Sequence, residues 1–447
     1  MKFELIKQIL FDEAKARGLA EYDVYYRMAT DLSADALNRE SNASSFGTAG
    51  GVSFRAVVDG RIGSAATECF EEGELRALVA RAMANAPLVD ADEEPIFYAP
   101  REGDVYGKVS ANAPSMPDAA TLRRAALALQ EKMYAASELV TSGTESAAGA
   151  AEVTVCLANS KGLSLSHTAA MEYAYAEAVI EKEGEASYGV VSANAVLGIE
   201  DIAAEAVEEA LLKLGGEPLP TGKYNVVFSA KQVRALLSAY GSIFSGKSAL
   251  LGLSLLAGKE GTEVASPCLS IYDDPFYGEN TMQLPFDAEG VPTYKKALVE
   301  NGVLKTLLYD LTTAKKAGKR TTGNAGRGSY ADPVSVGSFC RLVAPGDYTL
   351  DELFRELGDG VYITELKGLH SGCDAVTGDF SIESAGFLVK NGKKAGAVRG
   401  FTVAGNFFEL LKQVKAVGSE VEHGICGFSM TAAPAILVQG ISVAGAE

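Results

Sequence analysis

The chain has 447 residues, a formal net charge of −18, 47% hydrophobic residues and 22% charged residues. A chain of this length and composition is typical of a globular protein with two or three domains, each able to bury a core. The acidic balance repels a phosphate backbone and no run of Lys or Arg overcomes it locally, which argues against direct nucleic-acid binding.

The opening segment, residues 1–18, mixes Glu4, Lys7 and Asp12 into its apolar run. This pattern is typical of an amphipathic helix and not of a secretory signal. No stretch of 18 or more apolar residues is present, so we expect no membrane span. The six cysteines are scattered singly, without the close spacing of a disulfide scaffold. The sequence therefore predicts a cytoplasmic protein with reduced thiols and no membrane partner.

The first part of the chain mixes helix and strand patterns. Apolar-rich segments flank Asp59-Gly60, a pair that supplies the positive φ angles of a two-residue hairpin turn. We expect an N-terminal α+β domain over residues 1–105 that contains this hairpin. Its predicted elements are a helix over 1–18, strands over 24–30, 51–58 and 61–67, and a helix over 71–87.

A second α+β domain is predicted over residues 106–216. Residues 92–117 are rich in Pro, Asp and Gly and show no period, which indicates a connection. The segments that follow are typical of an antiparallel meander flanked by helices. Its predicted elements are a helix over 118–137, strands over 152–158, 163–169 and 171–181, and a helix over 200–214.

Residues 215–222 contain two prolines and three glycines, which cannot continue a helix, and we place the main domain boundary there. Beyond it, many short strand patterns alternate with turns that contain Gly or Asn. These patterns predict a large antiparallel sheet, curved or barrel-like, over residues 222–447. The expected fold class is therefore α+β, with two N-terminal units of hairpins and helices and a β-rich C-terminal domain.

Several motifs follow one another in a fixed order in the C-terminal half. They are LLAGKEGTEVASP, Asp273-Asp274-Pro275, FDAEGVPT, VENGVLKTLLYD, TTGNA, TGDFS, VAGN and ISVAG, and GRIGSAATE and ANSKGLSLSHT precede them. This series resembles the TldD/PmbA peptide-maturation family, whose older name refers to modulation of DNA gyrase. The resemblance covers most of the chain.

The resemblance implies a protease system with two kinds of subunit. The TldD-type subunit carries an HExxxH zinc helix and a later cysteine, whereas the PmbA/TldE-type subunit lacks the histidines. A catalytic zinc needs about three protein ligands and an open position for water. The matching helix here, residues 231–246, contains no His, Asp or Glu. We therefore expect no catalytic residue, no metal ligand and no cofactor in this chain.

By the same resemblance, we expect a PmbA/TldE-type subunit that acts with a TldD-type metalloprotease subunit on unfolded or leader peptides. A homodimer is expected in isolation. Two alternatives stay open: an autonomous metal-dependent peptidase with an unrecognised site, and a binding protein that contacts gyrase. The sequence names neither the peptide nor the catalytic partner.

The candidate degenerate-site positions are Leu237, Ser238 and Gly241 on the matching helix, together with Cys426 near the C-terminus. Cys426 stands about where the catalytic branch of the family places its zinc-ligating cysteine, so we expect it to face the helix over 232–245. A small buried residue that fills space is the common alternative for a free cysteine.

Gly378 and Asp379 in TGDFS are candidates for contact with substrate or partner, because this carboxylate could face a central cleft. Asp273 and Asp274 resemble a carboxylate pair for acid–base work. Followed by Pro275, they are more typical of a turn in which Asp accepts from a backbone amide two residues on.

Two further motifs carry alternative functions. Residues 241–248 match the phosphate-loop pattern GxxxxGK[ST], but a helical stretch over 232–240 precedes them, whereas a phosphate loop directly follows a buried strand. We therefore do not expect nucleotide binding. Two HxxC pairs, one of His370 and Cys373 and one of His423 and Cys426, form a possible Cys₂His₂ zinc set. Isolated His and Cys residues in Gly-containing segments are the more common interpretation.

Overall fold

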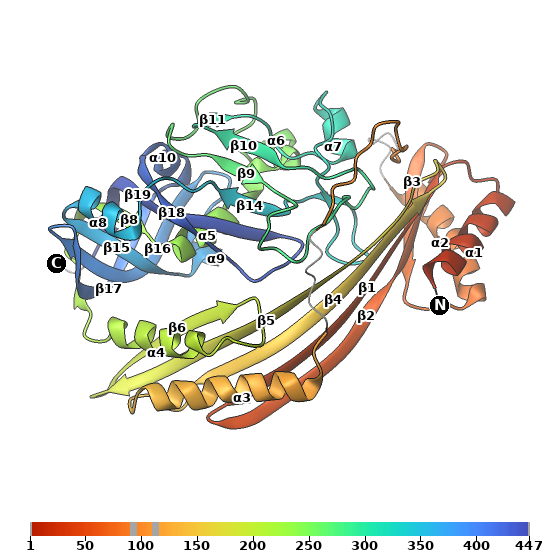
Figure 1. Cartoon of the computed structure of the whole chain (residues 1–447). Helices are drawn as coiled ribbons and strands as arrows, with labels where there is room; N and C mark the ends of the chain where they lie inside the picture. Colours follow the sequence, from red (N-terminus) through yellow and green to blue (C-terminus); the bar gives the residue numbers. More distant parts are fainter. Residues whose placement is uncertain (1, 90–95, 110–115, 446–447) are drawn as a thin grey trace.

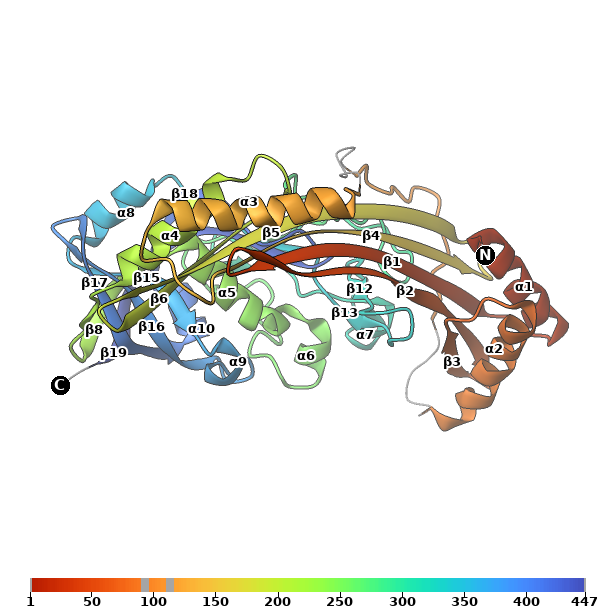
Figure 2. The same ribbon diagram turned by 90° about the horizontal axis from the view of Figure 1, so that it is seen from below.

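The computed structural model describes residues 2–89, 96–109 and 116–445 (Figure 1). Two large sheets organise the chain, an elongated N-terminal sheet and a C-terminal sheet that lies over part of its length. The two chain ends lie at opposite ends of the molecule in both views (Figures 1 and 2). The predicted α+β class is confirmed.

The first sheet is antiparallel, with strand order β3-β2-β1-β4-β5-β6. Its strands are β1 (Tyr22–Leu37), β2 (Glu40–Val58), β3 (Arg61–Thr67), β4 (Glu145–Asn159), β5 (Ser164–Lys182) and β6 (Glu185–Ala193). The two predicted N-terminal domains thus share one sheet, with three strands from each side of the boundary at residue 105. The boundary itself stays a prediction.

The hairpin between β2 and β3 forms at the predicted turn. Asp59 and Gly60 have φ angles of 48° and 75°, the left-handed values that a two-residue turn of this kind requires. The segments 163–169 and 171–181, predicted as two strands, form the single 19-residue strand β5. Pairing with β4 continues from Ala158↔Ser164 to Glu145↔Glu177, and this ladder holds the chain extended.

Helices cover the N-terminal sheet at both ends. They are α1 (Phe3–Ala16), α2 (Glu72–Asn85), the 3₁₀ turn η1 (Ala86–Leu88), α3 (Ala119–Ala136) and α4 (Asp201–Lys213). Helix α3 runs along the long strands (Figure 2), and its apolar residues pack on small side chains such as Ala148 and Ala176. Gly189 lets α4 approach closely, since an added Cβ would lie 2.1 Å from the carbonyl oxygen of Ala206.

The C-terminal sheet runs in the order β11-β10-β9-β14-β19-β8-β15-β16-β17-β7, with β18 paired to β19. Its strands are β7 (Glu217–Pro218), β8 (Gly222–Phe228), β9 (Ile271–Asp273), β10 (Lys296–Glu300), β11 (Val303–Leu304), β14 (Cys340–Val343), β15 (Gly360–Lys367), β16 (Asp379–Lys390), β17 (Lys393–Asn406), β18 (Val414–His423) and β19 (Met430–Ala444). A separate pair joins β12 (Ala325–Gly326) and β13 (Ser335–Val336).

This sheet is mixed, which corrects the prediction of a purely antiparallel one. The pairs β8–β15, β14–β19 and β7–β17 are parallel. Strand β17 also pairs with β19, so the sheet curves back on itself. The segment predicted as a linker contributes β7 to it.

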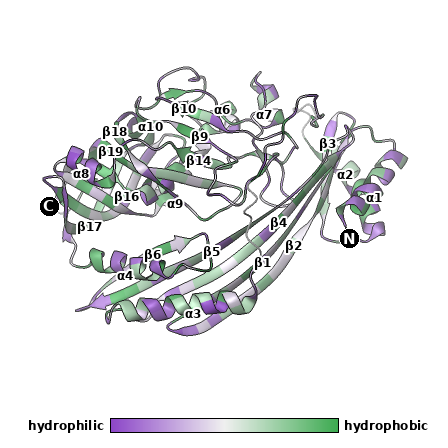
Figure 3. Cartoon of the chain, viewed as in Figure 1, coloured by the Kyte–Doolittle hydropathy of each residue, from purple (hydrophilic) through white to green (hydrophobic). Residues whose placement is uncertain are grey.

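Short helices pack around the C-terminal sheet. They are α5 (Ala230–Ala239), η2 (Gly241–Phe244), α6 (Gly246–Leu250), α7 (Leu311–Lys316), α8 (Leu350–Leu357), α9 (Leu369–Gly372) and α10 (Phe407–Lys412). Phe228, Tyr240 and Phe401 are fully or almost fully buried in the core between them. Hydrophobic and hydrophilic residues alternate along the surface helices (Figure 3). Within the described ranges, no helix has the length and apolarity to span a bilayer.

Candidate functional site

A cleft of about 680 Å³ separates the two sheets near the end of β6. One wall consists of residues 190–194 and helix α4, and the other consists of the first turns of α5 and strands β15 to β18. The cleft therefore contains residues that lie far apart in the sequence. It is large enough for several residues of an extended chain.

Helix α5 begins directly after β8, at a point in the cleft lining. Ser229 caps it by accepting a hydrogen bond from the amide of Gln232 at 3.4 Å. One face buries Val233 and Leu236, and Tyr240 stacks on Phe407 with ring centroids 4.3 Å apart. The helix predicted over 231–246 forms as α5 up to Ala239 and continues as the 3₁₀ helix η2, and no His, Asp or Glu lies on either element.

The degenerate-site positions, two on α5 and Gly241 at the start of η2, have different environments. Leu237 is buried in the C-terminal core, Ser238 is exposed, and Gly241 lies against the guanidinium of Arg341. A Cβ built on Gly241 would lie 2.2 Å from Nη1 of Arg341. A larger side chain at position 241 therefore requires Arg341 to move.

Cys426 is buried in a turn that meets the end of β6. Its amide donates to Oδ1 of Asn194 at 2.7 Å, and its thiol donates to the carbonyl of Glu279 at 3.2 Å. It packs in a cluster with Met282 and Phe286 that is distinct from the cluster of Leu237. The expected approach of Cys426 to Leu237, Ser238 or Gly241 stays a prediction.

The turn that contains Cys426 approaches α5 one helical turn before those positions. A Cβ built on Gly424 would lie 3.2 Å from Nη1 of Arg234. Asn194 joins this turn to β6, since its Nδ2 donates to the carbonyl of Gly424 at 3.0 Å and lies 3.2 Å from Nδ1 of His423.

The two HxxC pairs lie in different surroundings. Tyr240 is hydrogen-bonded to Cys373 and to the carbonyl of Asp379, whereas His423 and Cys426 contact Asn194. In the described part of the chain, no three His, Cys, Asp or Glu side chains are arranged to hold one metal ion. This arrangement gives no support to the Cys₂His₂ set.

The phosphate-loop match at residues 241–248 folds as η2 and the start of α6. Helix α5 separates it from β8. The amide of Gly246 donates to the carbonyl of Leu308 at 2.8 Å, so it does not point into an open anion site. The structure agrees with the expectation of no nucleotide loop.

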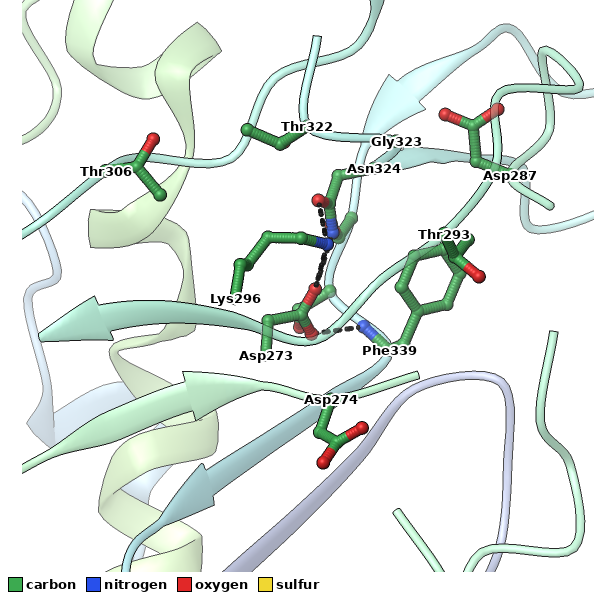
Figure 4. A network of polar contacts seen from close by, with 12 residues as sticks. Asp273, Asp274, Asp287, Thr293, Lys296, Thr306, Thr322, Gly323, Asn324 and Phe339 are labelled. Atoms are coloured by element: carbon green, nitrogen blue, oxygen red, sulfur yellow. Dashed lines mark hydrogen bonds and ion pairs between the residues drawn. The ribbon is translucent and has the colours of Figure 1, made fainter. Parts of the chain in front are cut away.

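Asp273 and Asp274 point in different directions from the end of β9 (Figure 4). Asp274 accepts from the amide of Phe276 at 3.0 Å, the predicted turn interaction two residues on. Asp273 is fully buried and accepts from Nδ2 of Asn324 at 2.7 Å and from the amide of Phe339 at 2.8 Å. The two carboxylates thus act in separate structural contacts.

Lys296 completes the buried network around Asp273. Its Nζ lies 3.3 Å from Oδ2 of Asp273 and donates to Oδ1 of Asn324 at 2.9 Å (Figure 4). Burial lowers the pKa of Lys296, and the Asp273 carboxylate opposes that shift. The network ties three segments of the C-terminal domain together. No local sequence pattern distinguishes Lys296, because its buried contacts are with residues 23 and 28 positions away in the chain.

Gly378 and Asp379 lie outside the lining of the cleft. Gly378 is buried with φ 86°, and its missing side chain makes room for the ring of Phe408. Asp379 is exposed and accepts from Nδ2 of Asn406 at 2.9 Å. Its role as a partner or substrate contact stays a prediction.

The sequence patterns did not predict the charged side chains of the cleft. Glu209 pairs with Lys213 at 2.9 Å and with Lys231 at 3.6 Å, while Arg234 lies 3.8 Å from Glu422. Burial lowers the pKa of Arg234, against the opposing charge of Glu422. The sequence feature that could have indicated these charges is a pair of cations, Lys231 and Arg234, which lie three residues apart soon after the helix cap Ser229.

The chain is thus an α+β protein of two large sheets with a cleft between them beside helix α5. Models of the PmbA/TldA metallopeptidase C-terminal domain, domain 1 and central domain match residues 221–445, 22–86 and 112–214. The chain belongs to the PmbA/TldA metallopeptidase family, also written TldD/PmbA.

Individual relatives agree with this membership. A metalloprotease of Methanothermobacter thermautotrophicus is 34% identical over 53% of this chain and 52% of its own length. A metalloprotease of Archaeoglobus fulgidus is 35% identical over 52% and 54%. The matched stretch of this chain thus spans about half the length of these two relatives. Metalloprotease PmbA of Escherichia coli is 28% identical over 50% of this chain and 47% of its length.

Solved structures match the whole fold. A Thermotoga maritima protein named as a proposed modulator of a DNA gyrase gives a TM-score of 0.90 at 27% identity, over 99% of this chain and 100% of that chain. TldE of Thermococcus kodakarensis gives a TM-score of 0.88 at 22% identity, over 98% and 100%, and shows the fold alone.

Proposed function

We propose that this chain is the PmbA/TldE-type subunit of a cytoplasmic TldD-type metalloprotease and that it supplies peptide-binding and docking surface. The observation that carries the proposal is helix α5. By the family resemblance it corresponds to the zinc helix, yet Leu237 and Ser238 on α5 and Gly241 at the start of η2 offer no ligand side chain. Zinc chemistry then belongs to the partner subunit, because a catalytic zinc needs about three protein ligands.

The proposal predicts that the protein purified alone contains no stoichiometric zinc and cleaves no unfolded peptide. Co-expression with a TldD-type protein of the same organism should give a co-purifying complex that cleaves the peptide. Elemental analysis and a cleavage assay with a labelled unstructured peptide measure both results. About one zinc per isolated chain, with chelator-sensitive cleavage, would instead support the autonomous peptidase.

A bare strand edge supports the docking part of the proposal. Strand β3 pairs only with residues 52–58 of β2, so within the described part of the chain residues 40–51 have no strand on their outer side. Residues 40–46, 48 and 49 are exposed, and the segment contains neither Pro nor Lys nor Arg. Long unprotected edges are rare in proteins that stay monomeric, because they pair with other strands.

The opposite edge of the same sheet is protected. On β6, the carbonyl of Tyr188 accepts from Nζ of Lys213 and that of Val190 accepts from Nζ of Lys231, both at 2.9 Å. Lysines on an edge are a common protection against strand addition. We infer that the outer edge of β2 is covered by a strand of another subunit, in a homodimer of the isolated chain or in the complex with the catalytic partner.

This inference predicts that Phe46→Lys weakens the assembly without unfolding the chain. Phe46 is 72% exposed, so little buried surface is lost, while a charge on the edge opposes strand pairing. Light scattering after gel filtration should show about a tenfold weaker association. Ala186→Lys on the protected edge β6 adds the same charge and serves as the control. Equal association of both variants and the unchanged chain would exclude the β2 edge.

A further inference from the structure

Arg234 presents unused hydrogen-bond donors to the cleft. Its guanidinium donates to no residue in ranges 2–89, 96–109 and 116–445, and its Nε is buried without a partner. The nearest carboxylate oxygen, on Glu422, lies 3.8 Å from Nη2, which is longer than a hydrogen bond. The Arg234 side chain is 18% exposed. A guanidinium taken partly out of water with its donors unpaired is costly, and a bound anion removes that cost.

The lysines beside Arg234 differ from it, because they are already paired. Lys231 donates to the carbonyl of Val190 at 2.9 Å and lies 3.6 Å from Glu209. Lys213 donates to the carbonyl of Tyr188 at 2.9 Å and pairs with Glu209 at the same distance. Arg234 differs from these two lysines because it donates no hydrogen bond within the described residues and its one ion pair, with Glu422, is long.

The position of Arg234 limits how a chain can lie in the cleft. Asn194 bridges the two walls through its hydrogen bonds to Gly424 and Cys426. Arg234 lies against the same turn, with Nη1 3.2 Å from a Cβ built on Gly424. An extended chain that enters along residues 190–193 meets this bridge beside Arg234, so its end is the part that reaches the guanidinium.

We propose that the cleft binds the free C-terminal carboxylate of a peptide, with Arg234 as the partner of that carboxylate. A guanidinium matches the two oxygens of a carboxylate in a bidentate pair, whereas a peptide N-terminus has the wrong charge. Glu205 and Glu208 also line the cleft, and their charges oppose a polyanion such as a nucleotide more strongly than a single carboxylate. Glu422, whose side chain is 58% exposed, turns toward solvent when the peptide binds. This proposal rests on the proposed peptide-binding role and adds its recognition element.

The test compares one unstructured hexapeptide as the free acid and as the C-terminal amide, each with an N-terminal fluorophore, by anisotropy with the purified full chain. The free acid should bind at least about tenfold more tightly than the amide, because only the acid forms the charged pair. Arg234→Gln should remove this difference. Arg234→Lys should keep part of it, since lysine retains the charge without the bidentate geometry.

Lys394→Gln, which also removes one positive charge from the cleft lining, should preserve the preference for the acid. Equal binding of acid and amide by the unchanged chain, or a preference that survives Arg234→Gln, would overturn the carboxylate site while leaving the peptide-binding role intact. If neither peptide binds, the site and the peptide-binding role both fail. If Arg234→Gln does not fold, a full acid preference in Arg234→Lys contradicts the bidentate pair.

Discussion

Replacing Lys296 by methionine is expected to lower the free energy of unfolding by about 3–5 kcal/mol, because removing one partner of a buried ion pair leaves the other charge uncompensated. The Lys296 side chain is 4% exposed and that of Asp273 is 0% exposed. Asn324 and the amide of Phe339 stay bonded to Asp273, but neither carries a charge. Urea unfolding followed by circular dichroism measures the loss.

The control for this prediction is Lys305→Met. Lys305 pairs with Glu300 at 3.2 Å, and both side chains are 44% exposed, so its loss should cost less than about 1 kcal/mol. The double variant Asp273→Asn, Lys296→Met should recover part of the stability, because both members of the buried pair are neutralised together, although the nearby buried Arg341 then loses the charge of Asp273. Similar small losses for Lys296→Met and Lys305→Met would show that the buried pair contributes no more to stability than the exposed pair.

Local patterns in the sequence predicted local structure well. The Asp59-Gly60 turn, the helix after Asp118 and the backbone interaction of Asp274 each depend on residues within three positions of one another. Strand lengths were less predictable. Pairing with neighbouring strands keeps the ends of β1 and β5 extended, and it does so more than the β-propensity of their own residues.

The candidate site was predicted only in part, because its geometry depends on long-range contacts. The lack of His, Asp and Glu over 231–246 is visible in the sequence, since it concerns one short continuous segment. The bridge from Asn194 to Cys426 spans 232 positions, and no local pattern indicates it. Cys426 was identified by the family resemblance, whereas no local pattern indicates that Arg234 lines a cleft with residues far away in the chain.

The parallel strand pairs were missed for a related reason. Parallel partners need long connections, so no hairpin turn marks them in the sequence. Strand β8 pairs with β15, more than 130 residues later, and the alternating pattern of each strand is compatible with either direction. The prediction of a large curved sheet followed from strand content, whereas the direction of each pair did not.

We expect the stability of the contact between the two sheets to depend on pH through Glu289. It is buried and accepts from the amide of Leu311 at 2.9 Å. Asp287 lies beside it and accepts from the amides of Glu289 and Ala325, both at 2.9 Å. Burial raises the pKa of Glu289 above its ordinary value of 4.5, the Asp287 charge raises it further, and Arg55 of the first sheet opposes the shift.

The sign of the effect follows from the raised pKa. The folded chain binds a proton at Glu289 that the unfolded chain has released, so stability falls as pH rises. The contribution of Glu289 is fully present below about pH 4.5 and is lost as pH increases through the raised folded-state pKa. Glu289→Gln removes this titration, and its amide oxygen still accepts from Leu311.

We expect Glu289→Gln to unfold at higher urea than the unchanged chain at pH 8 to 9, with a gain of roughly 1–3 kcal/mol, since one pKa unit corresponds to about 1.4 kcal/mol. At pH 5 the two chains should differ little, because Glu289 is protonated when folded. Glu300→Gln, at a side chain that is 44% exposed, is the control and should keep the pH slope of the unchanged chain. Parallel stability curves for the unchanged chain and Glu289→Gln from pH 5 to 9 would contradict a protonated Glu289 in the folded state. A loss of stability in Glu289→Gln at pH 8 would instead show that attraction to Arg55 outweighs the cost of burying the charge and that the Glu289 carboxylate is ionised in the folded chain.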